Sequence, residues 1–188
     1  MLRATIFACL SSLAACGNVS SPADDTCGTD VLPNGNFDAS TPPWIQEPVT
    51  PALLCGMPTI VPDSAPSAGC LGNTDGTTQT LSQTVPLPPT ASSVTLTGKI
   101  CISTADTAAV DHDVLQFDLL QGGAVISAIG KKTNRDGVAA CEFGALELTA
   151  PVTSAPDTAT FRIRSTLDAN MPTTFYVDSL KLTVGCTK

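Results

Sequence analysis

The sequence is short of positive charge and of histidine. It has 9 lysine and arginine residues against 17 aspartate and glutamate residues, a net charge of −8 at pH 7, and a single histidine, His112. An acidic surface of this kind disfavours nucleic acid and anionic lipid headgroups, whereas it suits calcium or cationic partners. We therefore expect no nucleic-acid partner.

Motifs that support catalysis or bind zinc are also missing. No two cysteines follow the C-x-x-C spacing and His112 is next to none of them, which argues against a zinc site. No G-x-S-x-G or similar motif supplies the nucleophile of a serine-histidine-aspartate triad, so we interpret His112 as a residue of the acidic loop Asp106–Asp113. Glu47, Glu142 and Glu147 lack the context of a glycosidase acid pair. We expect no enzyme.

The N-terminal apolar run is too short to span a bilayer. Residues 1–15 contain one basic residue, Arg3, followed by apolar sequence, and this pattern predicts a secretion signal. The segment Leu13-Ala14-Ala15-Cys16 resembles the lipobox of bacterial lipoproteins, which implies that Cys16 is lipidated and anchors the chain to a membrane. Because Gly17 follows instead of aspartate, that family's pattern favours the bacterial outer membrane or cell surface. The alternative is ordinary signal cleavage with Cys16 as a spare thiol.

After the signal peptide, the composition predicts a tether and then one domain. Residues 16–26 are small and polar and form the predicted flexible tether that follows the lipidated cysteine. Residues 27–188 remain for the domain, and roughly 160 residues suffice for one domain with a proper core.

Cysteine usage fits an exported protein. Of the 8 cysteines, Cys9 leaves with the signal and Cys16 carries lipid, so an even number remains for disulfides. The sequence allows many pairings, and we choose one that joins the two ends of the domain, one that closes a short proline-rich loop, and a third by elimination. The predicted pairs are Cys27–Cys186, Cys55–Cys70 and Cys101–Cys141.

The domain has the periodicity of β-strands, and no window has the periodicity of a helix. Val94, Leu96, Ile100 and Ile102 alternate with polar residues, as one buried strand face requires. The other predicted strands, separated by turns such as Asn134–Gly137, are Thr78–Val85, Val114–Leu120, Ala124–Lys132, Ala145–Thr149, Thr160–Arg164 and Thr174–Val184. This pattern predicts an all-β, antiparallel β-sandwich in a single domain.

The last of these strands contains a break in its alternation. Phe175 and Val177 set a period of two, but the next apolar residues are Leu180, Leu182 and Val184. One extra residue explains the change of parity, so we predict a β-bulge that turns Asp178 or Ser179 out of the regular pleat.

Several of these segments resemble the galactose-binding-like superfamily of jelly-roll domains, which includes many carbohydrate-binding modules. The resemblance lies in NGNFD at Asn34–Asp38, in Gln83 and Val85, and in the F-x-x-D pattern of Phe175 and Asp178. It implies a jelly roll of two packed antiparallel sheets. It also implies a structural calcium where the first and last strands meet.

Calcium prefers several oxygen ligands, which carboxylates and turn carbonyls can supply. We predict that Asp38 and Asp178 hold the ion, with oxygen from Asn36. The alternative is that Asp38 caps a turn and that Asp178 is a solvated bulge residue.

Carbohydrate-binding modules of this superfamily usually stack sugars on exposed aromatic rings, and this chain has one tryptophan and one tyrosine. Trp44 and Tyr176 are therefore the ligand-binding candidates, with burial of Trp44 in the core as its alternative. The sequence predicts a lipid-anchored, non-catalytic binding or adhesion module for a glycan or a surface protein. The alternative is a structural envelope lipoprotein stabilised by calcium and disulfides, with no soluble ligand.

Overall fold

The computed structural model describes residues 26–38, 44–106, 108–138 and 140–187. Within them the strands are β1 (Ile45–Glu47), β2 (Leu54–Cys55), β3 (Ala68–Gly72), β4 (Thr78–Pro86), β5 (Ala91–Ser103), β6 (Val114–Gln121), β7 (Ala124–Thr133), β8 (Gly144–Pro151), β9 (Thr158–Thr166) and β10 (Thr174–Cys186). A single-turn 3₁₀ helix, η2 (Asn134–Asp136), follows β7. The predicted signal peptide, Cys16 and nearly all of the predicted tether lie outside the described residues.

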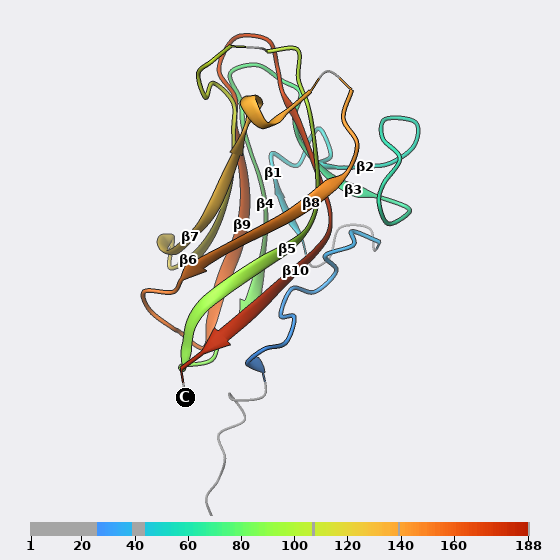
Figure 1. Ribbon diagram of the computed structural model, residues 1–188. Coiled ribbons are helices and arrows are strands. Elements are labelled where there is room, and N and C mark those ends of the chain that lie inside the picture. The colour runs from blue at the N-terminus through green and yellow to red at the C-terminus, as the bar shows by residue number, and fades with distance from the viewer. Residues whose placement is uncertain (1–25, 39–43, 107, 139, 188) are drawn as a thin grey trace, which may run out of the picture.

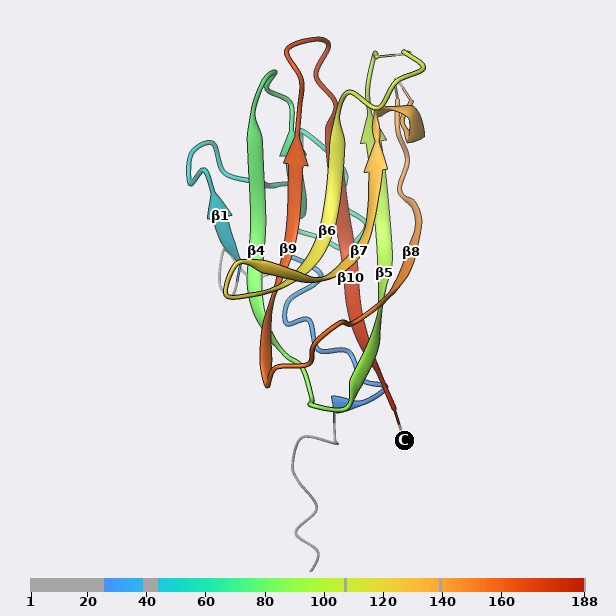
Figure 2. The ribbon, with the colours of Figure 1, turned by 90° about the vertical axis from the view of Figure 1, so that its left-hand side faces the viewer.

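The strands form two antiparallel sheets that pack face to face (Figures 1 and 2). We call the sheet with the order β2-β3-β10-β5-β8 sheet A and the sheet with the order β1-β4-β9-β6-β7 sheet B. Successive strands β4 and β5, and β8, β9 and β10, pass from one sheet to the other. The predicted antiparallel β-sandwich is confirmed.

Every strand predicted from periodicity is present, within a few residues of its expected ends. The short strands β1, β2 and β3 were not predicted, because their sequences are too short or too rich in glycine to show a period of two. They form one edge of the sandwich, where β1 pairs with β4 and β2 pairs with β3. Tertiary contacts rather than local sequence thus define this edge.

The core between the sheets is made of the inward-facing half of each strand. Four phenylalanines from four different segments are almost completely buried in it, together with leucine, isoleucine and valine: Phe37, Phe117, Phe161 and Phe175. This alternation explains why the polar residues of the same strands lie on the two outer faces.

The predicted bulge in the last strand is confirmed. The register of β10 against β5 shifts between Asp178 and Lys181, and Ser179 has a positive φ of 51°. The N-terminal segment packs against this irregularity, because Leu180 N donates to Gly35 O over 2.9 Å. A Cβ added to Gly35 would lie 1.8 Å from Leu180 O, so this close approach requires glycine.

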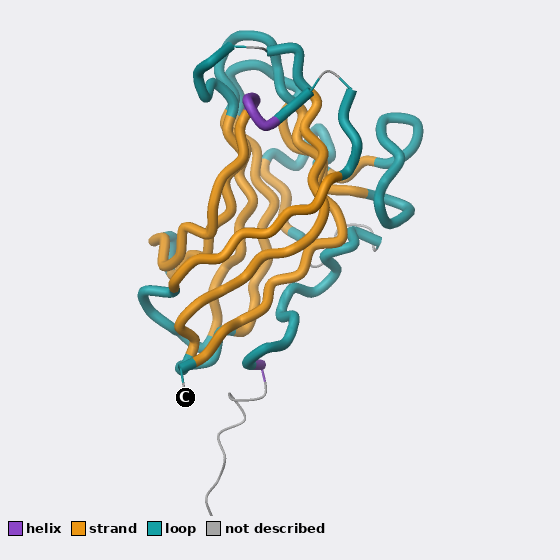
Figure 3. Tube along the Cα trace, viewed as in Figure 1, coloured by secondary structure: helices purple, strands orange, loops and turns teal. Residues whose placement is uncertain are grey.

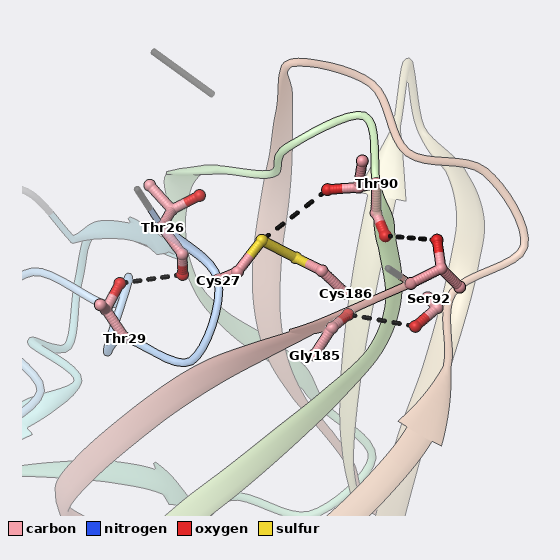
Figure 4. Close-up of a disulfide and its surroundings, with 8 residues drawn as sticks. Thr26, Cys27, Thr29, Thr90, Ser92, Gly185 and Cys186 are labelled. Carbon is pink, nitrogen blue, oxygen red and sulfur yellow. Dashed lines mark hydrogen bonds between the residues drawn. A yellow bond between two sulfur atoms is a disulfide. The ribbon is translucent and has the colours of Figure 1, made fainter. Parts of the chain in front are cut away.

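All three predicted disulfides are present: Cys27–Cys186, Cys55–Cys70 and Cys101–Cys141. The first joins the start of the described chain to the end of β10 (Figure 4). Around it, Thr90 Oγ1 lies 3.7 Å from Cys27 Sγ, Ser92 Oγ donates to Gly185 O, and Thr29 Oγ1 donates to Thr26 O. Three disulfides indicate an extracytoplasmic protein.

The two ends of the sandwich differ. One end holds the Cys27–Cys186 disulfide and the C-terminus, whereas the opposite end, which we call the loop end, carries the loops β5–β6, β7–β8 and β9–β10 (Figures 1 and 3). No helix in the described part of the chain is long and apolar enough to cross a membrane.

The hairpin that joins β6 and β7 bends over the outer face of sheet B and crosses in front of β9 and β4 (Figure 2). Register shifts in the β6–β7 pair, at Phe117/Asp118 and at Leu119/Leu120, mark the bend. Asp118 and Leu120, which alternate with the inward Phe117 and Leu119, are also buried.

Candidate functional site

Trp44 belongs to the core. Its side chain is only 2 % exposed, and its ring stacks on Phe37 with centroids 5.1 Å apart and meets Phe161 edge-on. Its indole N–H donates to Asn34 O over 3.0 Å, so the polar atom of the ring is satisfied inside the protein. In this structure Trp44 offers no face on which a sugar could stack.

Tyr176 lies on the outer side of sheet A, as its alternation with Phe175 and Val177 predicted. Its strand neighbours are Cys70 on β3 and Cys101 on β5, and each of these cysteines forms a disulfide, with Cys55 and with Cys141 respectively. The half-buried ring lines a hollow of about 170 Å³. The two disulfides hold the strands beneath Tyr176 in place, which is what a preorganised binding residue requires.

A larger hollow adjoins this one at the strand edge of the sandwich. It measures about 510 Å³ and shares Pro51, Thr74 and Gln79 with the hollow at Tyr176. We call the pair the edge hollows. Hydroxyl, amide and proline residues and one carboxylate line much of them: Glu47, Pro48, Thr50, Pro51, Thr59, Asn73, Thr74, Thr77, Thr78, Gln79, Thr80, Thr174 and Tyr176. The remaining lining residues are apolar, glycine or cysteine: Ala52, Leu53, Cys55, Cys70 and Gly72.

The turn between β3 and β4, at the base of the edge hollows, is held by a side-chain hydrogen bond and by close backbone packing. Gln79 is 3 % exposed, and its Oε1 accepts a hydrogen bond from Gly72 N over 2.6 Å. Gly72 has a φ of +97°, and a Cβ there would lie 2.1 Å from Thr173 O. The turn from β3 into β4 is therefore closely packed, and it presents Asn73 and Thr74 on a rigid support.

Asp178, the residue singled out by the parity break, is fully buried and is held by Ser64. Its Oδ2 accepts from Ser64 N over 2.8 Å, and its Oδ1 lies 2.9 Å from Ser64 Oγ. Ser179 N donates to Oδ1 as well. Burial raises the pKa of Asp178, these hydrogen bonds oppose the rise, and the nearby charge of Asp63 adds to it.

The predicted calcium residues are only partly brought together. Asn36 O lies 3.1 Å from the same Ser64 Oγ that contacts Asp178, so these two oxygens converge as expected. Asp38 is exposed and its backbone N–H donates to Asn34 Oδ1. The carboxylate coupled to Asp178 is instead Asp63, which accepts from Ser179 Oγ over 2.8 Å. Sequence reasoning missed Asp63. Its position in the proline-flanked turn PDSAP marks a loop with several oxygen atoms that can bind a metal ion.

A cation at this position would find oxygen ligands of the kind that calcium prefers. The donors are two carboxylates, a carbonyl and the hydroxyls of Ser64 and Ser179. No group of three or more histidine, cysteine, aspartate or glutamate side chains with metal-binding geometry occurs among the described residues. The donor set thus fits a hard cation bound largely by neutral oxygens, and it does not fit a zinc site.

The acidic loop around His112 forms a buried polar network at the loop end. Asp106 Oδ2 lies 3.0 Å from His112 Nδ1 and accepts from Asn134 Nδ2 over 2.9 Å. Asp113 is fully buried, and its carboxylate accepts from Thr173 Oγ1 over 2.6 Å and from Asp168 N over 3.0 Å. The network therefore connects the three loops of the loop end.

The electrostatics of this network agree with a structural role. The hydrogen bond from Ala108 N lowers the pKa of Asp106, and His112 lowers it further. Hydrogen bonds from Asn170 lower the pKa of Asp168. A hollow of about 490 Å³ lies beside Asp106 and Asn134, but the polar atoms of both side chains already have partners within the protein. The interpretation of His112 as a loop residue matches this arrangement.

No protein-family model matches the sequence, and no curated protein matches it. Among solved structures, part of an arabinose-bound α-L-arabinofuranosidase of glycoside hydrolase family 51 is similar, with a TM-score of 0.57 and 12 % identity. The match covers 85 % of this chain but 27 % of that enzyme. A family 61 carbohydrate-binding module in complex with β-1,4-galactotriose is also similar, with a TM-score of 0.48, 11 % identity, and coverage of 82 % of this chain and 98 % of that module. At these identities the arabinofuranosidase match shows a shared β-sandwich fold.

Proposed function

We propose that this domain is a non-catalytic glycan-binding module whose ligand occupies the edge hollows. The lining of these hollows supports the proposal, because sugar hydroxyls both donate and accept hydrogen bonds. Glu47 accepts, Asn73 does both, and the threonine hydroxyls add further partners. Tyr176 supplies the aromatic surface on which the apolar face of a sugar ring packs.

The position of the hollows suits a surface-anchored protein. Residues Thr74 and Thr77 lie beside the β9–β10 loop at the loop end, since Leu167 N donates to Thr77 O over 2.9 Å. The described chain begins at the opposite end, near Cys27 (Figure 1). If Cys16 carries a lipid and the tether follows it, as we propose, the hollows face away from the membrane of the cell surface or outer membrane.

A second part of the proposal concerns calcium. We propose that Ca²⁺ stabilises the domain through the carboxylates of Asp63 and Asp178 and the carbonyl of Asn36. When bound, the ion would neutralise two like charges and tie the N-terminal segment to the last strand. The convergence of Asn36 O and Asp178 on Ser64 supports this position.

A glycan-array screen with the purified full-length chain tests the main proposal. We expect retention on at least one class of plant, bacterial or host glycan. The variant Tyr176→Ala should weaken that binding about tenfold, which corresponds to about 1.4 kcal/mol. Thr183→Ala, on the same strand but away from the edge hollows, is the matched control and should bind normally. Absence of any glycan binding, or equal binding by both variants, would contradict the proposal and favour the structural envelope role.

A further inference from the structure

Strand register aligns five residues in one row across the outer face of sheet B. Glu47 pairs with Thr80, Thr80 with Arg164, Arg164 with Gln116, and Gln116 with Lys131. We call this set the outer row. It crosses every strand of the sheet, from the edge hollow at β1 to the β7 edge.

The two arginines of β9 differ in how their charge is compensated. Arg162 Nη2 lies 2.7 Å from the buried carboxylate of Asp118. Arg164 Nη2 instead donates to the neutral Oε1 of Gln116 over 2.7 Å. Gln116 in turn donates to Asp118 Oδ1 over 3.1 Å, so both oxygens of Asp118 are engaged elsewhere.

Arg164, on a half-buried side chain, thus has a neutral hydrogen-bond partner where Arg162 has a carboxylate. It takes part in no ion pair with any described residue, whereas Lys131 in the same row pairs with Asp111 at 2.9 Å. The Nε atoms of Arg162 and Arg164 are both buried without a hydrogen-bond partner, so only the Nη contacts distinguish the two arginines. A half-buried guanidinium with no carboxylate in contact is stabilised by an anion that meets it.

The edge hollow at β1 lies next to this arginine. Thr80 lines the hollow and is the direct strand neighbour of Arg164. Adjacent strands are about 4.8 Å apart, less than the length of one sugar residue. A chain of sugars lying in the hollow and directed across the strands therefore reaches the guanidinium.

We propose that the ligand of the edge hollows is an acidic glycan, and that the carboxylate of one of its uronic acid residues pairs with Arg164. This inference rests on the proposed glycan-binding function and adds the substrate class. A guanidinium binds a carboxylate through two parallel hydrogen bonds, and the neutral partner Gln116 leaves Arg164 donors for this purpose. The carboxylate gives Arg164 the ion-pair partner that no described residue of this row provides.

The carboxylate of Glu47 in the same row does not prevent this. Its strand is separated from that of Arg164 by β4, so the two backbones lie about two strand spacings, or roughly 10 Å, apart. This exceeds the Debye length of about 8 Å at physiological ionic strength. Glu47 is then an acceptor for the hydroxyls of a neighbouring neutral part of the ligand.

The test compares two polymers with the same sugar backbone, one with ionised carboxylates and one with methyl esters in their place. Binding of the full-length chain to polygalacturonate and to its methyl ester is measured at physiological ionic strength, by titration calorimetry or affinity electrophoresis. We expect the acid to bind at least about tenfold more tightly than the ester. Arg164→Gln should bring binding of the acid down to about the level of the ester, and Arg164→Lys, which keeps the charge but loses the paired donors, should reduce the preference in part. Lys181→Gln removes one positive charge from the outer face of sheet A and is the matched control.

Each other outcome contradicts the inference in a recognisable way. Equal binding to acid and ester, or equal loss in Arg164→Gln and Lys181→Gln, overturns it. Arg164-dependent binding to dextran sulfate that equals binding to polygalacturonate also overturns it, because the site would then be a general anion patch. Binding to neutral glycans alone overturns the acidic-ligand inference but leaves the proposed function standing, whereas no binding to any glycan overturns both. A thermal melt of each variant confirms folding, and Arg164→Lys replaces Arg164→Gln if the latter does not fold.

Discussion

The guanidinium of Arg162 and the carboxylate of Asp118 meet at 2.7 Å across β9 and β6, with the carboxylate fully buried although it lies on the outer side of sheet B. Removal of one partner from such a pair leaves the other charge buried without compensation. We expect Asp118→Ala to lower the free energy of unfolding by about 3 kcal/mol in urea denaturation. Asp111→Ala, which breaks the exposed pair with Lys131, should have a much smaller effect. Similar losses in the two variants would show that the Arg162–Asp118 pair is effectively solvated.

The close approach of Gly35 to β10 leads to a second prediction. A methyl group at Gly35 would overlap Leu180 O, so Gly35→Ala must displace the N-terminal segment from the bulge. We expect a loss of about 1–3 kcal/mol in unfolding free energy, in the range of an overpacked core. At Gly144 the nearest atom to an added Cβ is 3.9 Å away, so Gly144→Ala serves as the control and should be almost neutral. A Gly35→Ala variant as stable as the parent would argue against this docking.

The disulfides should contribute according to the chain length that each one closes. Cys27 and Cys186 are separated by 159 residues, and Cys55 and Cys70 by 15. The chain-entropy model assigns about 5 kcal/mol to the first and about 3 kcal/mol to the second. The double variant Cys27→Ala/Cys186→Ala should therefore lose more stability than Cys55→Ala/Cys70→Ala. Peptide mapping without reduction checks the pairing, and a peptide that joins Cys27 to Cys55 would disprove it.

The network at the loop end should lose stability in acid. The pKa of Asp106 is lowered in the folded protein by Ala108 N and His112, so its ionised form stabilises the fold at any pH above its unfolded pKa of about 3.9. This contribution disappears as the pH falls through the lower, folded pKa. Melting temperatures between pH 7 and pH 2 should consequently fall more steeply below pH 4 in the parent than in Asp106→Asn. Parallel curves for the two proteins would contradict this role of Asp106.

Calcium should raise the melting temperature of the parent. At a free concentration about 100 times the dissociation constant, binding adds about 2.7 kcal/mol, which corresponds to a shift of roughly 5–10 °C for a domain of this size. The measurement is a thermal melt in excess chelator and in millimolar calcium. Asp63→Asn and Asp178→Asn should each remove the shift, whereas Asp38→Asn should leave it intact. An unchanged melting temperature in the parent, or a shift that depends on Asp38 and not on Asp63, would refute the proposed ligand set.

Much of the fold could be predicted from local sequence, because the relevant signals act over a few residues. The alternation of Val94, Leu96, Ile100 and Ile102 predicted β5, since a strand with one buried face must repeat every two residues. The parity change after Val177 predicted the bulge at Asp178 for the same reason. Cysteine spacing and the position of the domain ends were sufficient to choose the pairing that the structure contains.

The candidate sites could not be predicted in this way, because they are built from long-range contacts. Ser64 and Asp178 are 114 residues apart in the sequence. Only the docking of the proline-rich loop on β10 brings Ser64 N to within 2.8 Å of Asp178 Oδ2. The residues next to Trp44 in the sequence do not determine whether its ring faces solvent or the core. Its burial follows from its contacts with Phe37 and Phe161, which form only in the folded core. The alignment of Glu47, Thr80 and Arg164 depends on the register of three strands from distant parts of the chain. A one-residue slip in either pairing would turn these side chains to the other face, and tertiary packing of both sheets against one core is what fixes that register.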